Sequence, residues 1–314
     1  MELYLICEDS LEGIFAAIYE AYLSKRPRSE VHLQIGEEEN LRLFAEYRHV
    51  RADPELAAKV AATVRKCLGD DGYMSICYAL AATAADKGEA VFRVITAAFD
   101  GERSSPKKEN LTSSHVHSSP NEENLASSHV HSSPNEENPT NSHVHSSLKK
   151  ENFTNSHIHS SPIMENLTNP HVMRVFELAR ACGRETHALL GFIRFSELEN
   201  GLLYAPIGPK SNILTFMMPH FAERMPEENF VIHDEKRGLF GVHPAGGEWF
   251  AVTGDEGISL SRADFSFSTQ EAHYRELFIT FFHSIAIDER RNNRSQRGHL
   301  PLRYREYMVE FTER

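Results

Sequence analysis

Apolar residues in the N-terminal third are spaced as one buried strand followed by helices. The run Leu3–Cys7 predicts the strand, and Asp9 with Glu12 three residues later has the form of a capping box that begins a helix. Asp53 before Pro54 predicts the start of another helix, which reaches about Leu68. Further elements are predicted as a short strand at 31–35 and helices at 73–85 and 89–99. Residues 1–103 should therefore form a strand plus a helical layer.

The pattern after residue 165 predicts strands joined by tight turns, with helices between them. Residues 172–190 form a helical pattern. Its apolar face is expected to contain Val172, Val175, Phe176, Ala179 and Cys182, and His187, eleven residues after Phe176, should lie close to that face. Glu199-Asn200-Gly201 separates two strand-like runs as a hairpin turn would. Further elements are predicted as strands at 192–198, 202–206, 230–233, 239–243 and 249–253 and helices at 212–225, 270–287 and from 301. We expect an α+β fold with a mainly antiparallel sheet packed with helices, in which residues 166–314 either stand alone or share one core with residues 1–103.

A 14-residue repeat interrupts these patterns over residues 104–165. His115, His129, His143, His157 and His171 lie 14 residues apart, and the first four begin a His-x-His pair. The tract consists mainly of Ser, Asn, His, Glu and Pro, and it has too little apolar area to offset the entropy of ordering. We therefore predict a disordered insertion. The alternative is metal capture by the imidazoles, which stays open, and no metal site is predicted.

Composition narrows the classes of function. The formal net charge of −12 argues against broad, nonspecific binding to nucleic acid or anionic membrane, but it permits a local basic patch. The four cysteines are scattered, as expected for free thiols in a reducing compartment. The sequence has no long apolar stretch, leader-like segment or nucleotide-binding motif, so we expect a cytoplasmic protein with no membrane partner and no cofactor.

One group of polar residues could form a catalytic site. Glu185 and His187 lie near the end of the predicted 172–190 helix, Arg194 follows on the next strand, and His220 lies in a later helix. These residues are candidates for acid–base chemistry or for binding a nucleobase. The alternatives are a buried, hydrogen-bonded histidine and a structural ion pair between Glu185 and Arg194.

A second group could bind nucleic acid. Six arginines fall within the 16 residues from Arg290 to Arg305, interleaved with amides. Arginine can bind phosphate with two hydrogen bonds, and a tyrosine can stack on a base. The candidates are Arg290, Arg291, Arg294, Gln296, Arg297, Arg303 and Tyr304. The alternative is a solvated segment paired with the protein's own carboxylates.

Several motifs resemble one bacterial family. They include Asp9–Gly13, Gly183–His187, Gly191–Phe195, Pro219–Arg224, Ile232–Gly238 and Pro301–Tyr304. The chain is similar here to proteins described as probable DNA metabolism or putative DNA repair proteins. The resemblance implies DNA as a partner and a radical-SAM protein encoded nearby, and some members carry a uracil-DNA glycosylase-like domain. It implies no particular reaction.

Two main hypotheses of function follow. The first is a DNA metabolism or repair accessory protein that binds DNA or a nucleotide and works with a radical-SAM partner. The second is a stand-alone enzyme acting on a nucleobase or nucleotide, and a protein-interaction module is a further alternative. Convergence of Glu185, Arg194 and His220 on one pocket would favour an enzyme, whereas dispersed candidates with exposed arginines would favour a binding protein.

Overall fold

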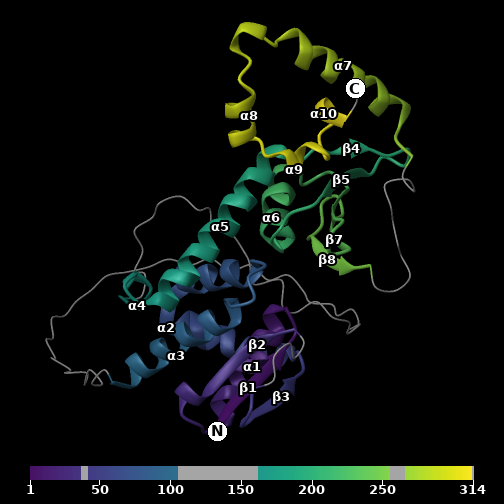
Figure 1. The fold of residues 1–314 in the computed structure, drawn as a ribbon. Helices are drawn as coiled ribbons and strands as arrows, with labels where there is room; N and C mark the ends of the chain where they lie inside the picture. The colour runs from purple at the N-terminus through teal and green to yellow at the C-terminus, as the bar shows by residue number, and fades with distance from the viewer. Residues whose placement is uncertain (37–41, 105–161, 255–265, 313–314) are drawn as a thin grey trace, which may run out of the picture.

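The computed structural model describes residues 1–36, 42–104, 162–254 and 266–312 (Figure 1). Most of the repeat tract, including its four His-x-His pairs, lies outside these residues. Its predicted disorder and the question of metal binding therefore stay predictions.

The first sheet is three-stranded and entirely parallel, in the order β2-β1-β3. Helix α1 connects β1 to β2, as a parallel pair requires. Leu3, Leu5 and Cys7 alternate along β1 and face the helices. The elements are β1 (Glu2–Cys7), α1 (Leu11–Leu23), η1 (Arg28–Glu30), β2 (Val31–Ile35) and β3 (Ala45–Val50).

Helix α1 is capped by a different residue than the sequence indicates. Ser10, rather than Asp9, is the N-cap, and its hydroxyl accepts a hydrogen bond from the N–H of Gly13 at 2.9 Å. Asp9 instead pairs with the buried ammonium of Lys87, 2.5 Å away. The predicted N-cap is therefore displaced by one residue, and Gly13, now three residues after the cap, has no side chain to complete a capping box.

Two long helices pack around the first sheet, α3 (Lys87–Ser104) against β2 and α2 (Pro54–Ala81) against α1. In α2, the Asp53 side chain accepts hydrogen bonds from two N–H groups of the first turn, as predicted. Gly69 leaves the helical conformation with φ of 75°, so the helices expected on either side of it are two parts of one bent helix. Helix α3 contains the third predicted helix.

Helix α5 (Pro170–Phe192) joins the two halves of the molecule. Its first half contributes Val172 and Val175 to the core around α1–α3, and its second half contributes Cys182 and Leu189 to the core around α6. Figure 1 shows α5 running from the N-terminal helices to the second sheet.

A short helix, α4 (Pro162–Glu165), precedes α5 and lies within the segment predicted to be disordered. Ile163 and Met164 pack against the N-terminal core. These two apolar side chains explain why residues 162–165 are ordered, contrary to the prediction for them.

The second sheet is mixed, in the order β4-β5-β6-β7-β8. Strands β5 and β6 pair in parallel through the crossover helix α6, and the other three pairs are antiparallel. The predicted turn at Gly201 has φ of 80° and joins β4 to β5. The elements are β4 (Ser196–Glu197), β5 (Leu203–Ile207), α6 (Leu214–Arg224), β6 (Phe230–Asp234), β7 (Leu239–His243) and β8 (Phe250–Thr253).

The α+β class is thus correct, but a mainly antiparallel sheet is wrong. Three of the strand pairs are parallel, namely β1–β2, β1–β3 and β5–β6. The helices that the sequence places after β1 and after β5 are long enough to reverse the chain direction, and this makes parallel pairing possible.

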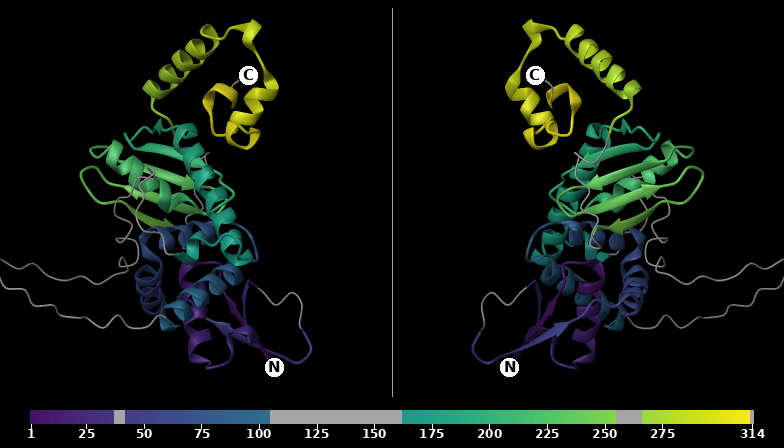
Figure 2. Two further views of the ribbon diagram at one scale, coloured as in Figure 1. Left: turned by 90° about the vertical axis from the view of Figure 1, so that its left-hand side faces the viewer. Right: turned by 90° about the vertical axis from the view of Figure 1, so that its right-hand side faces the viewer.

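Residues 266–312 form a C-terminal arm at one end of the molecule (Figure 2). Helix α7 stands away from the second sheet and buries none of its residues, whereas α9 returns to the body and buries Tyr304. The rings of Phe282 on α7 and Phe311 on α10 are in contact, with 5.7 Å between their centroids. The elements are α7 (Thr269–Ser284), η4 (Asp288–Arg290), α8 (Asn293–His299), α9 (Leu302–Arg305) and α10 (Val309–Thr312).

Candidate functional site

Glu185 lies at the contact between α5, the β5–α6 loop and α9. Its carboxylate accepts hydrogen bonds from the backbone N–H of Lys210 at 2.9 Å and of Ser211 at 3.0 Å. The Tyr304 hydroxyl donates to the same carboxylate at 3.4 Å, and the Arg303 guanidinium lies 3.6 Å away. Because Glu185 is only 7% exposed, these partners take the place of water.

These partners keep Glu185 ionised. Burial by itself raises the pKa of the carboxyl, but the N–H of Lys210, the N–H and hydroxyl of Ser211 and the Arg303 charge outweigh it and leave the pKa below its usual value. A general base for chemistry at neutral pH needs a pKa near the working pH and an open path to a proton. Glu185 has neither, and its geometry fits a structural role.

The β5–α6 loop is fixed from two further directions. Arg237 donates to the backbone carbonyls of Pro209 and Lys210 and pairs with the fully buried Asp234 at 2.9 Å. Tyr307 of the arm packs so closely on Gly208 that a Cβ there would lie 2.1 Å from its hydroxyl oxygen. The loop therefore depends on the arm as well as on α5.

Arg194 belongs to a different contact. It follows α5 in an irregular segment rather than the predicted strand, and it pairs with the buried carboxylate of Glu310 on α10 at 2.8 Å. Within the described residues, Nε of Arg194, Nε of Arg305 and Oε2 of Glu310 are buried without a hydrogen-bond partner. The ion pair attaches α10 to the end of α5.

The two histidine candidates lie on the surface. His187 is exposed on α5, and His220 is exposed on α6, where its ring meets the ring of Phe221 edge to face. The side chain of His187 therefore does not occupy the buried position considered for it. Among the contacts made by the described residues, none joins Glu185, His187, Arg194 and His220 into one group.

The arginine-rich segment divides into an exposed part and an attached part. Arg290, Arg291, Arg294, Gln296 and Arg297 are all exposed. The side chains of Arg290, Arg294 and Arg297 form no ion pair or hydrogen bond with another residue of the described chain. Asn292 caps α8 by accepting a hydrogen bond from the N–H of Ser295 at 3.0 Å.

Arg303 and Tyr304 make internal contacts. Tyr304 is 2% exposed, and its ring packs 5.5 Å from that of Phe192. The Arg303 guanidinium lies 4.5 Å above the ring of Tyr304. The stacking role predicted for Tyr304 therefore does not fit, because neither face of its ring is open.

Helix α7 exposes a row of large apolar side chains. Tyr274, Leu277, Phe278 and Phe281 follow one another at helical spacing, and Phe281 is 57% exposed. Exposed apolar surfaces of this kind are typical of binding sites. In the sequence this surface is recognisable only as part of a helix rich in Phe.

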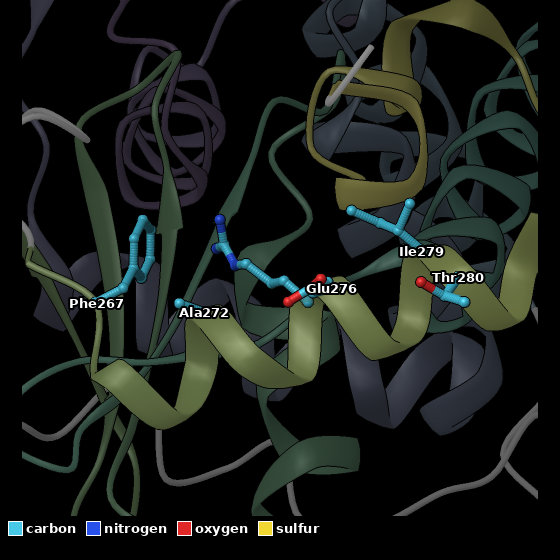
Figure 3. Close-up of a pocket in the computed structure, with 6 residues that line it drawn as sticks. Phe267, Ala272, Glu276, Ile279 and Thr280 are labelled. Atoms are coloured by element: carbon cyan, nitrogen blue, oxygen red, sulfur yellow. The ribbon is translucent and has the colours of Figure 1, made fainter.

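The inner side of α7 borders a hollow of about 320 Å³ (Figure 3). Arg275 lies over the Phe267 ring, 4.0 Å from its centroid, and donates a hydrogen bond to the Ser196 hydroxyl at 2.7 Å. Ala272 and Ile279 provide apolar walls. None of the predicted catalytic or nucleic-acid-binding residues lines this hollow.

A second hollow of about 350 Å³ lies beside the first sheet, and the sequence does not indicate it. Tyr4, His32 and Glu89 line it, and the Glu89 carboxylate accepts a hydrogen bond from the N–H of Leu33 at 2.8 Å. Because β1, β2 and α3 are far apart in the chain, no local spacing could reveal the cluster.

The metal and thiol candidates are limited. In the described ranges, no group of three His, Cys, Asp or Glu side chains is placed to hold a metal ion. The four cysteines, all within the described residues, form no disulfide bond, and burial raises the pKa of Cys7 and of Cys182 to about 12. These two thiols are therefore poor nucleophiles. No described helix combines the length and apolarity needed to cross a membrane.

The second half of the chain matches a known family model. Residues 146–310, more than half of the 314 residues, match DUF4130, a domain of unknown function. The chain belongs to the DUF4130 family. The matched region contains α5, the second sheet and the arm, so Glu185 and the exposed arginines lie inside the DUF4130 domain. No curated protein and no solved structure matches the chain.

Proposed function

We propose that this DUF4130 protein is an accessory protein of DNA metabolism or repair that binds DNA through the exposed arginines of η4 and α8. The main support is the state of Arg290, Arg294 and Arg297, which are exposed and form no ion pair with a described carboxylate. In a protein with a net charge of −12, cations left unneutralised favour an external anion. Phosphate groups suit arginine because they accept paired hydrogen bonds.

The enzyme alternative has less support. An acid–base site needs its groups around one reacting atom. Glu185 is occupied by backbone and hydroxyl donors, Arg194 by Glu310, and the two histidines are exposed on different helices. The dispersal of these groups, together with the exposed arginines, is the arrangement expected of a binding protein.

DNA binding can be tested by replacing Arg290, Arg294 and Arg297 together by Ala. Each phosphate contact contributes roughly 0.7 (single strand) to 0.9 (duplex) to the slope of log affinity against log salt. The triple variant should therefore bind labelled oligonucleotides more weakly and with a slope reduced by about 2 to 3. Fluorescence anisotropy over a salt series measures both quantities.

A matched control removes the same charge elsewhere. Arg51, Lys59 and Lys66 are exposed in the N-terminal half, and replacing all three by Ala changes the net charge equally. This control should keep the slope of the wild type. If the arm variant and the control behave alike, the arginines do not bind DNA and the proposal fails.

The family resemblance adds a radical-SAM protein as a proposed partner. The exposed row on α7 supports a protein contact of this kind, because apolar helix faces dock into grooves of partners. Phe281→Ser should weaken capture of the radical-SAM protein encoded nearby, whereas Phe250→Ser, at a site 47% exposed on β8, should not. Equal capture by both variants would remove α7 from the proposal and leave DNA binding untouched.

A further inference from the structure

The outward face of α5 carries a second cationic surface. Arg180, Arg184 and His187 are spaced four and three residues apart, so their side chains lie on one face of the helix. All three are exposed. Glu185 follows Arg184 directly, but its side chain points into the protein. Within the sequence motif Arg184–His187, Arg184 and His187 therefore face solvent while Glu185 faces the core.

This surface is not neutralised by the described part of the protein. The side chains of Arg180, Arg184 and His187 form no hydrogen bond or ion pair within the ranges that the structure describes. Glu177, an exposed acid of α5 three residues before Arg180, pairs with Arg174 at 3.5 Å, and Arg174 also pairs with Asp86 at 2.8 Å. The side chains of Arg180 and Arg184 are therefore left to bind an external anion.

An exposed aromatic ring extends the same face. Phe176 lies one helical turn before Arg180 and is 44% exposed. A cationic track with an open aromatic ring is typical of proteins that bind single-stranded nucleic acid, because the ring stacks on an unpaired base while the cations bind phosphates. Duplex DNA hides the faces of its bases, so it could use only the cations.

The arm brings the α8 arginines to the C-terminal end of this helix. Leu300, which follows α8, packs in the same apolar cluster as Leu189 of α5. The Tyr304 ring then meets Phe192 at the last turn of α5. Figure 1 shows α8 at the end of the molecule where α5 terminates.

We propose that the outward face of α5 and the exposed arginines of α8 form one surface for single-stranded DNA. Arg180 and Arg184 bind phosphates, His187 donates a hydrogen bond to the backbone, and Phe176 stacks on a base. From Phe176 to His187 the face is about 16 Å long, enough for several nucleotides. This inference rests on the proposed function in one respect, namely that both surfaces bind the same strand.

The test is the double variant Arg180→Gln, Arg184→Gln. Glutamine has nearly the helix propensity of arginine, so α5 should remain folded. We expect affinity for a single-stranded oligonucleotide to fall roughly tenfold and the salt slope to fall by about 1.4, the value for two lost phosphate contacts. The control Lys59→Gln, Lys66→Gln removes two exposed charges from α2 and should leave both values unchanged.

A second variant tests the stacking. Phe176→Leu keeps an apolar side chain but removes the ring, and it should weaken single-strand binding at least about fivefold with no effect on duplex binding. Phe250→Leu on β8 is the matched control. If Phe176→Leu weakens single-strand and duplex binding equally or leaves both unchanged, the single-strand assignment is overturned.

The outcomes separate this inference from the proposed function. Suppose that replacing Arg290, Arg294 and Arg297 abolishes binding, whereas Arg180→Gln, Arg184→Gln binds as the wild type does. That result would refute the α5 surface and keep the proposed function. Loss in the α5 variant alone would support the surface and refute the role of α8. If neither variant changes the salt slope, both fail.

Discussion

The hydroxyl of Tyr304 donates a hydrogen bond to the carboxylate of Glu185, a residue 119 positions earlier in the chain, with 3.4 Å between the oxygens. The sequence indicates Glu185 as a catalytic candidate and Tyr304 as a nucleic-acid-binding candidate. The structure makes them buried partners that attach the C-terminal arm to α5 and to the β5–α6 loop. The exposed arginines are thus held at a defined place by residues that do not themselves reach a ligand.

Glu185→Gln should destabilise the fold. The amide keeps the shape but loses the charge, and its NH₂ group must face one of the N–H donors of Lys210 and Ser211. Removing a buried, hydrogen-bonded charge of this kind costs roughly 2–4 kcal/mol of unfolding free energy. Urea denaturation measures the loss.

The control for that variant is Glu177→Gln on the same helix. Glu177 is exposed, and its ion pair with Arg174, at 3.5 Å, is in contact with solvent. Because such surface ion pairs contribute little, the loss of Glu177 should change the unfolding free energy by about 0.5 kcal/mol or less. Equal urea midpoints for wild type and Glu185→Gln would contradict the structural role. A stably folded Glu185→Gln protein that lost its cellular function would return Glu185 to the list of catalytic residues.

The cost of Glu185→Gln should depend on pH. In the folded protein, the N–H groups, the Ser211 hydroxyl and Arg303 overcome the effect of burial and hold the pKa of Glu185 below the ordinary 4.5. A carboxyl with a lowered folded-state pKa stabilises the fold above its unfolded pKa, and that stabilisation is lost as pH falls through the folded-state pKa. Glutamine does not titrate.

The difference in unfolding free energy between wild type and variant should therefore be constant above about pH 5 and shrink as the pH falls below about 4.5. Urea titrations of both proteins across this range provide the measurement. A difference that grew with acidity would mean that the folded-state pKa of Glu185 is raised, which would contradict the hydrogen-bond assignment.

The sequence predicts most of the buried face of α5 but not where that face ends. Val172, Val175 and Cys182 are buried, as their helical spacing indicates. Phe176, expected on the same face, is exposed, and so is His187, eleven residues later. The edge of the buried face is set by the positions of α2, α3 and α6, which no local pattern records.

The candidate site shows the same limit. Polar groups near an apolar face need partners or a ligand, and Glu185 finds its partners within the protein. The expected partner, Arg194, is wrong because Arg194 pairs with Glu310. The actual partners are backbone N–H groups of a loop and the hydroxyl of Tyr304. Backbone donors carry no side-chain signal, so a sequence cannot indicate them.

Deleting residues 105–161 should leave the unfolding free energy nearly unchanged if a Gly/Ser linker spans the gap, because the tract is poor in apolar residues. Extending the deletion through Met164 should cost about 1–3 kcal/mol, since Ile163 and Met164 pack on the N-terminal core. Thermal midpoints of the two deletion proteins provide the comparison. Equal midpoints would mean that α4 adds nothing to the core.

Two glycines in the DUF4130 domain should respond to alanine in opposite directions. Gly183 lies inside α5 with open space where a Cβ would be placed, so Gly183→Ala should stabilise the protein by up to about 1 kcal/mol through the better helix propensity of alanine. At Gly208 a Cβ would meet the rigid ring of Tyr307, and Gly208→Ala should cost about 1–3 kcal/mol by forcing the arm away from the loop. Truncating the ring with Tyr307→Ser in the Gly208→Ala background should then cost less than the same truncation in the wild type. If the two costs simply add, Tyr307 does not press on Gly208 in solution, and the arm is attached through its other contacts.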